Sequence, residues 1–172
     1  RAKDGVSALA MIQPVERAIH ERLGPYIWGY DDETPEQSVG KSLTERGLTL
    51  AVMEMCTGGA LTNAITNVPN SISYFKGGII AHEDTTLSAT GVPKAEMERY
   101  GVVSQHTANT MADTVRRNLN ADLGVAVTGV PGPGEFEGKP LGLAYISVTN
   151  GHQTRELEMR LPPRQETIKP RV

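Results

Sequence analysis

The chain has 172 residues, of which 38% are hydrophobic and 22% are charged. That length predicts one compact domain, or one domain plus a fragment, because single cores are commonly built from about 100 to 200 residues. Seventeen Lys and Arg stand against twenty Asp and Glu, a formal charge of -3, which lacks the basic excess that nucleic-acid binding needs. No apolar run approaches the roughly 20 residues of a membrane span. Composition therefore predicts a soluble cytoplasmic protein that binds neither nucleic acid nor membrane.

Cysteine and histidine usage argues against a disulfide and against a metal site. Cys56 is the only cysteine, and the histidines at positions 20, 82, 106 and 152 never pair at a metal-ligand spacing such as i, i+4. We therefore expect neither a metal nor a cofactor. The sequence begins at Arg1 and shows no charged stretch followed by an apolar one. We expect a piece of a longer cytoplasmic protein.

The first elements are helical. Residues 11–23 place four apolar side chains along one helical stripe and stop before Gly24-Pro25. Residues 26–29 then predict a brief strand. A second helix is expected to begin at the capping sequence Thr34-Pro35-Glu36-Gln37 and to run to about Arg46.

Beyond Gly47 strands and helices alternate. The apolar segment 48–53 is typical of a central strand covered on both faces. The further expected strands are 77–82, 123–128, 143–149 and 154–161, and the expected helices are 60–66, 84–89, 94–100 and a long one capped by Ser104. Asn150-Gly151 favours a hairpin between the last two strands. The pattern predicts a three-layer α/β/α sandwich with a mixed, mainly parallel sheet and a C-terminal hairpin.

Ligands of open α/β sheets bind beyond the carboxyl ends of the strands. The segments that close three of the predicted strands are residues 54–59, 82–84 and 128–134, and we expect them to share one rim. Thr57-Gly58-Gly59 lies between a strand and a helix, where unpaired N–H groups favour an anion. The alternative is that Gly58 and Gly59 only make the turn and allow close packing of the helix on the strand.

Other residues at this rim each have a functional and an ordinary interpretation. Glu54 either holds the turn or binds a substrate donor, and His82 is either a general base or a partly buried polar group. Cys56 is either a nucleophile or a small buried residue. Thr128 and Gly129 end a strand, and prolines 131 and 133 make the loop 129–134 a rigid wall rather than a dinucleotide fingerprint. Lys139 either reaches an anion or is solvated.

Several of these stretches resemble one family. LTLAVMEMCTGG at residues 48–59 is similar to LTLAxAESCTGG, which opens the CinA C-terminal domain of the PncC-type nicotinamide mononucleotide deamidases. The resemblance continues through VPNSISYFKGGIIAH, TGVP, YGVVS, NADLGVAVTGVPGPG and KPLG, over about residues 35–165. It implies that residues 34–172 form this domain without its whole closing helix, and that residues 1–33 end a preceding linker domain.

The resemblance also implies a reaction. In the family a serine of ESCTGG attacks a carboxamide, a lysine about thirty residues later takes its proton, and ammonia leaves. Here Met55 stands at the serine position, Leu87 at the lysine position and His82 at a tyrosine position. A thioether and an alkyl chain can perform neither step. The binding residues implied or suggested at this rim are Glu54, Thr57, Gly58, Gly59, His82, Thr128, Gly129 and Lys139.

Three hypotheses follow for function. The first is a deamidase-like domain that has lost its Ser-Lys dyad and keeps a nucleotide-sized pocket for a pyridine nucleotide. The second is an active amidohydrolase that uses Cys56 and His82. The third is a non-catalytic assembly scaffold. For each we expect a homo-oligomer that works beside the N-terminal domain of the parent chain.

Overall fold

The structure is a computed structural model that describes residues 4–162. It forms two compact units, Arg1–Val39 and Gly40–Val172, which divide within the helix α2, Pro35–Arg46. The predicted domain boundary after residue 33 lies just before this helix. The polar C-terminal stretch and the implied closing helix lie outside the described residues.

The first unit is helical, and its predicted strand is wrong. Helix α1 spans Gly5–Leu23 and so begins earlier than predicted, and the 3-10 helix η1 spans Gly24–Tyr26. Pro25 favours helical backbone angles there, and the Trp28 carbonyl accepts from the Ser38 hydroxyl at 2.6 Å. The Trp28 carbonyl is therefore bonded to a helix side chain and not to a neighbouring strand.

The predicted capping sequence does begin α2. Thr34 N donates to Gln37 Oε1 at 3.0 Å, and Gln37 N donates to Thr34 Oγ1 at 3.4 Å. These reciprocal bonds satisfy backbone N–H groups that the first turn of a helix leaves without partners. The cap prediction is confirmed.

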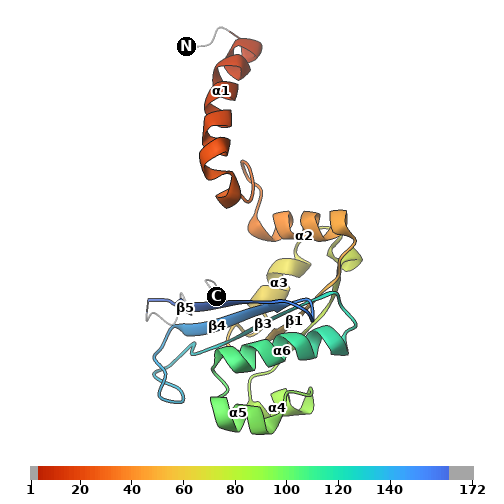
Figure 1. The fold of residues 1–172 in the computed structure, drawn as a ribbon, viewed down its shortest axis with the longest axis vertical. Helices are drawn as coiled ribbons and strands as arrows, with labels where there is room; N and C mark the ends of the chain where they lie inside the picture. The colour runs from red at the N-terminus through yellow and green to blue at the C-terminus, as the bar shows by residue number, and fades with distance from the viewer. Residues whose placement is uncertain (1–3, 163–172) are drawn as a thin grey trace. The chain divides into compact units, whose positions relative to one another are not determined.

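The second unit contains a five-stranded sheet in the order β2-β1-β3-β4-β5 (Figure 1). Its strands are β1 Leu50–Glu54, β2 Phe75–Ile80, β3 Leu123–Gly129, β4 Leu143–Thr149 and β5 Thr154–Arg160. The pairs β1–β2 and β1–β3 are parallel, whereas β3–β4 and β4–β5 are antiparallel. Four strands therefore run in one direction and β4 runs against them, which confirms the mixed, mainly parallel sheet and its hairpin.

Helices cover both faces of this sheet. They are α3 Ala60–Thr66, the 3-10 helix η2 Ser71–Ser73, α4 Asp84–Ala89, α5 Lys94–Tyr100 and α6 Gln105–Asn118. Figure 1 shows α3 on one side of the sheet and α4, α5 and α6 on the other. The Ser104 side chain accepts from Thr107 N at 3.1 Å and caps α6 as predicted. The three-layer sandwich is confirmed.

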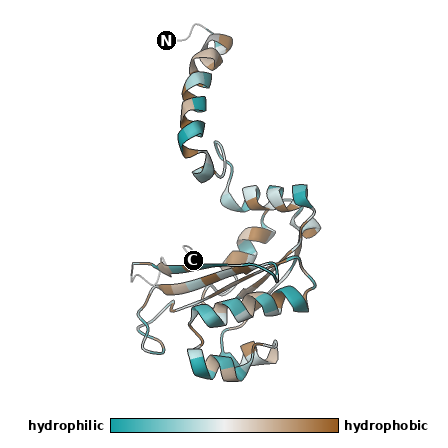
Figure 2. Ribbon diagram, viewed as in Figure 1, coloured by the Kyte–Doolittle hydropathy of each residue, from teal (hydrophilic) through white to brown (hydrophobic). Residues whose placement is uncertain are grey.

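Two hydrophobic clusters fill the spaces between the layers, and Figure 2 shows hydrophobic residues gathered along the strands. One cluster packs α4, α5 and α6 against β1 and β3, and includes Met53, Leu87, Met111 and Val115, each fully buried. The other lies on the opposite face and contains Leu43, Leu50, Val52, Ile65 and Tyr74. Met111 and Val115 thus lie on the face of α6 that packs against the sheet. Strand β2 is an edge strand whose partner β1 ends at Glu54, opposite Ile80, so β2 ends at Ile80 rather than continuing to His82.

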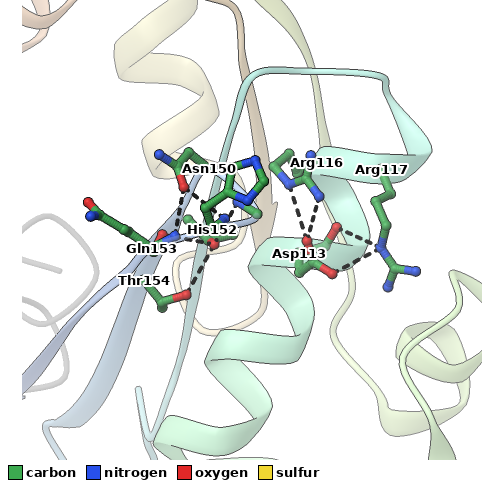
Figure 3. A network of polar contacts seen from close by, with 9 residues as sticks. Asp113, Arg116, Arg117, Asn150, His152, Gln153 and Thr154 are labelled. Atoms are coloured by element: carbon green, nitrogen blue, oxygen red, sulfur yellow. Dashed lines mark hydrogen bonds and ion pairs between the residues drawn. The ribbon is translucent and has the colours of Figure 1, made fainter.

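The end of α6 lies close to the turn between β4 and β5 (Figure 3). Asp113 binds Arg116 at 2.8 Å and Arg117 at 3.0 Å along the helix. Asn150 Oδ1 accepts from the backbone N–H groups of His152 and Gln153 at 2.9 and 2.8 Å. The hairpin loop therefore has four residues, 150–153, and the Asn150 side chain organises it.

Candidate functional site

Three predicted rim residues line one cavity at the carboxyl ends of the parallel strands. Met55 follows β1, His82 follows β2, and Gly129 ends β3. Together with residues 130–136 they enclose about 170 Å³. Parallel strands bring their carboxyl ends to the same edge of a sheet. The prediction of a shared rim with the Gly129–Gly134 loop as a wall therefore agrees with this cavity.

Met55 and Leu87 belong to the same hydrophobic cluster. Met55 is 9% exposed and Leu87 is fully buried. The Met55 sulfur lies 3.2 Å from Thr128 Oγ1, and that hydroxyl is also 3.0 Å from the Val102 carbonyl oxygen. The two positions at which the resemblance implies a nucleophile and a base are thus occupied by apolar packing residues.

The turn after β1 is held by a buried carboxylate of the protein itself. Glu54 is fully buried. Its Oε2 accepts from Thr57 Oγ1 at 2.5 Å, from Gly59 N at 3.0 Å and from Leu61 N at 3.1 Å. Its Oε1 accepts from the backbone and the hydroxyl of Thr62 at 2.7 and 2.5 Å. The carboxylate therefore caps the start of α3.

These contacts change the interpretation of the Thr57-Gly58-Gly59 turn. Burial raises the pKa of the Glu54 carboxyl. The hydrogen bonds from Thr57, Thr62 and Leu61 lower this pKa by more than burial raises it, so the net pKa lies below its usual value. The group is charged at neutral pH. An anion from a ligand is predicted at Thr57-Gly58-Gly59, but the N–H groups of Gly59, Leu61 and Thr62 donate to the Glu54 carboxylate of the protein itself. Two roles are predicted for Glu54, to hold the turn or to bind a substrate donor, and its hydrogen bonds correspond to the first.

Of the other candidate residues, Cys56, Thr128 and Lys139 lie outside the cavity lining, whereas His82 belongs to it. Cys56 is buried, with 3% exposed. The Lys139 ammonium lies 3.1 Å from Glu137 Oε2 and borders a different, open depression beside α5. Thr128 is fully buried behind Met55. His82 is exposed and lines the cavity.

No metal centre is evident among residues 4–162, where no group of three His, Cys, Asp or Glu side chains is placed to hold an ion. Within the same range, no helix has both the length and the apolar character to cross a membrane. The side chains that line the cavity include a thioether, an imidazole, a carboxylate and a phenyl ring, from Met55, His82, Glu135 and Phe136.

A family model described as CinA C-terminal domain matches residues 32–172. The chain belongs to the CinA C-terminal domain family. Two similar proteins are a putative competence-damage inducible protein of Desulforudis audaxviator, 37% identical over 98% of this chain, and a CinA-like protein of Thermosynechococcus vestitus, 44% identical over 86%. The match covers 41% and 36% of those proteins. The chain thus spans about two fifths of the length of the curated relatives it matches.

Solved structures of CinA proteins share the fold. The competence/damage inducible protein CihA from Agrobacterium tumefaciens aligns with a TM-score of 0.75 and 27% identity, over 79% of this chain and 85% of that one. A CinA superfamily protein from Escherichia coli aligns with a TM-score of 0.76 and 24% identity, over 87% and 91%. The second likeness concerns the fold alone.

Two cavity residues, Glu135 and Phe136, lie between the CinA-like motifs and were not predicted as site residues. Phe136 is 47% exposed and lines the cavity beside Met55. A signal was present, because Phe136 comes two residues after the Gly- and Pro-rich loop, and an aromatic side chain offers a large apolar surface to a ligand. The prediction of a wall covers residues 129–134 only and assigns no role to the two side chains that follow them.

Proposed function

We propose that this CinA C-terminal domain binds a pyridine nucleotide without hydrolysing it. The observation that carries the proposal is the packing of Met55 and Leu87 in one hydrophobic cluster. In this family these positions are the ones at which a serine nucleophile and a lysine base are expected. A domain with apolar side chains at both has no group that could attack a carboxamide by the Ser-Lys route.

The size of the cavity supports the binding of one ring. Its volume of about 170 Å³ is slightly more than the cavity of about 150 Å³ that holds benzene in another protein. Typical ligand pockets enclose about 300–1,000 Å³. A nicotinamide ring therefore fits inside beside Phe136 and Met55, whereas the ribose and phosphate would extend out of the cavity.

Phosphate binding at Thr57-Gly58-Gly59 is not part of this function, because Glu54 already accepts from Gly59, Leu61 and Thr62. Hydrolysis through Cys56 has little support, since Cys56 is buried and does not line the cavity. A thiolate nucleophile needs an accessible position next to a base. His82 alone remains as a polar side chain able to donate to a carboxamide oxygen.

The test is a calorimetric titration of the purified chain with nicotinamide mononucleotide, run beside an assay for released ammonia. We expect saturable binding and no ammonia above the buffer rate. Phe136→Ala should weaken binding about tenfold, since stacking of an aromatic side chain on a base contributes about 1–3 kcal/mol. Ammonia release at the rate of a relative with an intact dyad would contradict the proposal, and so would the absence of binding heat.

A matched control separates stacking from general loss of aromatic surface. Tyr26 is 81% exposed and belongs to the first compact unit. Tyr26→Ala should leave the dissociation constant unchanged. Equal weakening by Phe136→Ala and Tyr26→Ala would show that the cavity is not the binding site.

A further inference from the structure

The loop that walls the cavity ends in a tight turn. Phe136 and Lys139 exchange two backbone hydrogen bonds, with N···O distances of 3.1 and 2.9 Å. Between them Glu137 and Gly138 have φ angles of +52° and +67°. Two successive left-handed residues are the signature of a type I′ turn, which projects the side chains at its tip. Glu137 therefore stands at the tip of the wall.

The Glu137 side chain reaches from this tip to the connection between α5 and α6. Its Oε1 accepts from Val102 N at 2.9 Å, and its Oε2 accepts from Val103 N at 3.0 Å. The Lys139 ammonium lies 3.1 Å from the same Oε2. Burial raises the pKa of the Glu137 carboxyl, but the Val102 and Val103 N–H groups and Lys139 together bring it below its usual value. The carboxylate is thus a charged bridge between two segments 34 to 35 residues apart.

Residue 101 leaves the space that this bridge needs. A Cβ at Gly101 would lie 2.7 Å from Glu137 Oε2 and 2.8 Å from Lys139 Nζ. The backbone of Gly101 also has a φ of +87°, which is unfavourable for residues other than glycine. Any side chain at this position would push the carboxylate away from Val102 and Val103. The position of the Glu137 carboxylate therefore requires a glycine at residue 101.

The bridged segment also borders the floor of the cavity. The Val102 carbonyl accepts from Thr128 Oγ1 at 3.0 Å, and that hydroxyl lies 3.2 Å from the Met55 sulfur. Met55 and residues 129–136 line the cavity together. The tip of the wall is consequently bonded to Val102 and Val103, and Val102 is also bonded to Thr128 behind the floor of the cavity.

We infer that Glu137 is a positioning residue that latches the 130–136 wall over the cavity and thereby sets ligand affinity. This inference rests on the proposed function, because it names the group that shapes that same binding site. Residue 137 makes no direct contact with the cavity. Its effect passes through the position of Phe136 and the preceding loop.

The first measurement needs no ligand. Amide hydrogen exchange is followed at residues 102, 103 and 130–139 in the parent chain and in Glu137→Gln. The side-chain amide of this variant has an NH2 group in place of one carboxylate oxygen. That NH2 group faces the backbone N–H of Val102 or of Val103, so one buried N–H donor loses its acceptor. We expect exchange about tenfold faster at these residues, with only a small fall in the global unfolding midpoint in urea, because the chain stays folded while the loop opens locally. Unchanged exchange would overturn the latch.

The second measurement is calorimetric titration with nicotinamide mononucleotide. We expect Glu137→Gln to raise the dissociation constant in inverse proportion to the fraction of molecules whose wall stays closed, which gives about a tenfold rise where about one tenth stay closed. Faster exchange with an unchanged dissociation constant would overturn the positioning role. A parent chain that binds no nicotinamide mononucleotide would overturn the proposed function, while the exchange rates would still decide whether Glu137 holds the wall.

Two further variants sharpen the result. Gly101→Ala displaces the same carboxylate from the opposite side, so its effect on exchange should not add to that of Glu137→Gln in the double variant. Additive effects would show that residues 101 and 137 act separately and would overturn the latch. Glu98→Gln removes an equal charge from the exposed ion pair with Lys94 and should change neither exchange nor binding.

Discussion

Glu54 Oε1 accepts two hydrogen bonds from Thr62, one from the backbone N–H at 2.7 Å and one from the hydroxyl at 2.5 Å. Its second oxygen receives Thr57, Gly59 and Leu61. One buried carboxylate therefore joins the last residue of β1 to the turn and to the first residues of α3. A residue that is charged, fully buried and surrounded by donors contributes strongly to stability only while all its bonds persist.

We predict that Glu54→Gln strongly destabilises the second compact unit. The amide keeps one acceptor oxygen but places an NH2 group against donors, so buried N–H and hydroxyl groups lose their acceptor. Each unsatisfied buried donor costs about 1–3 kcal/mol, and the free energy of unfolding should fall by about 3 kcal/mol or more. Urea denaturation followed by circular dichroism measures this change.

The control for this prediction is Glu98→Gln, which removes a carboxylate from a solvated pair. Lys94 Nζ lies 3.6 Å from Glu98 Oε1, and both side chains are mostly exposed. Exposed pairs of this kind contribute about 0–1 kcal/mol. Similar losses for the two variants would mean that the contacts of Glu54 do not stabilise the fold.

The lowered pKa of Glu54 predicts a specific loss of stability in acid. The folded pKa lies below the ordinary carboxyl value of 4.5, so the folded state resists protonation more than the unfolded chain does. The stabilisation is therefore complete above the unfolded pKa and is lost as the pH falls through the folded pKa. The difference in unfolding free energy between the parent and Glu54→Gln should shrink below about pH 4.5. A gap that stays constant from pH 7 to pH 3 would contradict this.

A separate prediction concerns the contact between α6 and β3 at Gly124. A Cβ at this position would lie 2.0 Å from the Ala112 carbonyl oxygen and 2.8 Å from Arg116 Cβ. Because a backbone atom cannot move aside without shifting the helix, Gly124→Ala should lower the free energy of unfolding by about 3 kcal/mol. Differential scanning calorimetry measures the shift.

Gly5→Ala is the matched control, since no atom lies within 4 Å of a Cβ at Gly5 in α1. That variant should leave the melting transition of the second unit in place. A melting temperature for Gly124→Ala equal to that of the parent would show that the helix lies farther from β3 than the structure places it.

Sequence patterns predicted the second unit well where local signals agreed with tertiary packing. Helices α3 and α5 begin and end where predicted, because glycine or proline borders each of them. The strand expected at residues 26–29 failed for the opposite reason. An apolar tetrapeptide has strand propensity, but a strand needs a partner, and Pro25 instead starts a 3-10 turn.

The candidate site was predicted in position but not in its contacts. Topology alone brings Met55, His82 and Gly129 to one edge, so their meeting could be foreseen. Which donors remain for a ligand could not be foreseen, because the direction of the Glu54 side chain depends on how α3 packs. The same holds for Lys139, whose ammonium turns to Glu137 rather than to the cavity.

A Ser-Lys dyad requires its two side chains to face each other, and we predict that positions 55 and 87 still do. Leu87→Lys alone puts an ammonium group into a fully buried site and should lower the free energy of unfolding by about 3–5 kcal/mol. Met55→Ser supplies a hydroxyl to that amine, so the double variant should lose less than the sum of the single losses. Ammonia release from nicotinamide mononucleotide should appear only in the double variant.

The control pair is Met55→Ser with Leu43→Lys. Leu43 is 6% exposed and belongs to the cluster on the other face of the sheet, so these two losses should add. Residues more than about 7–10 Å apart without shared partners are normally independent. If the 55/87 pair is also additive in urea denaturation, the two side chains do not meet, and the packing of Met55 with Leu87 could not be the remnant of a catalytic pair.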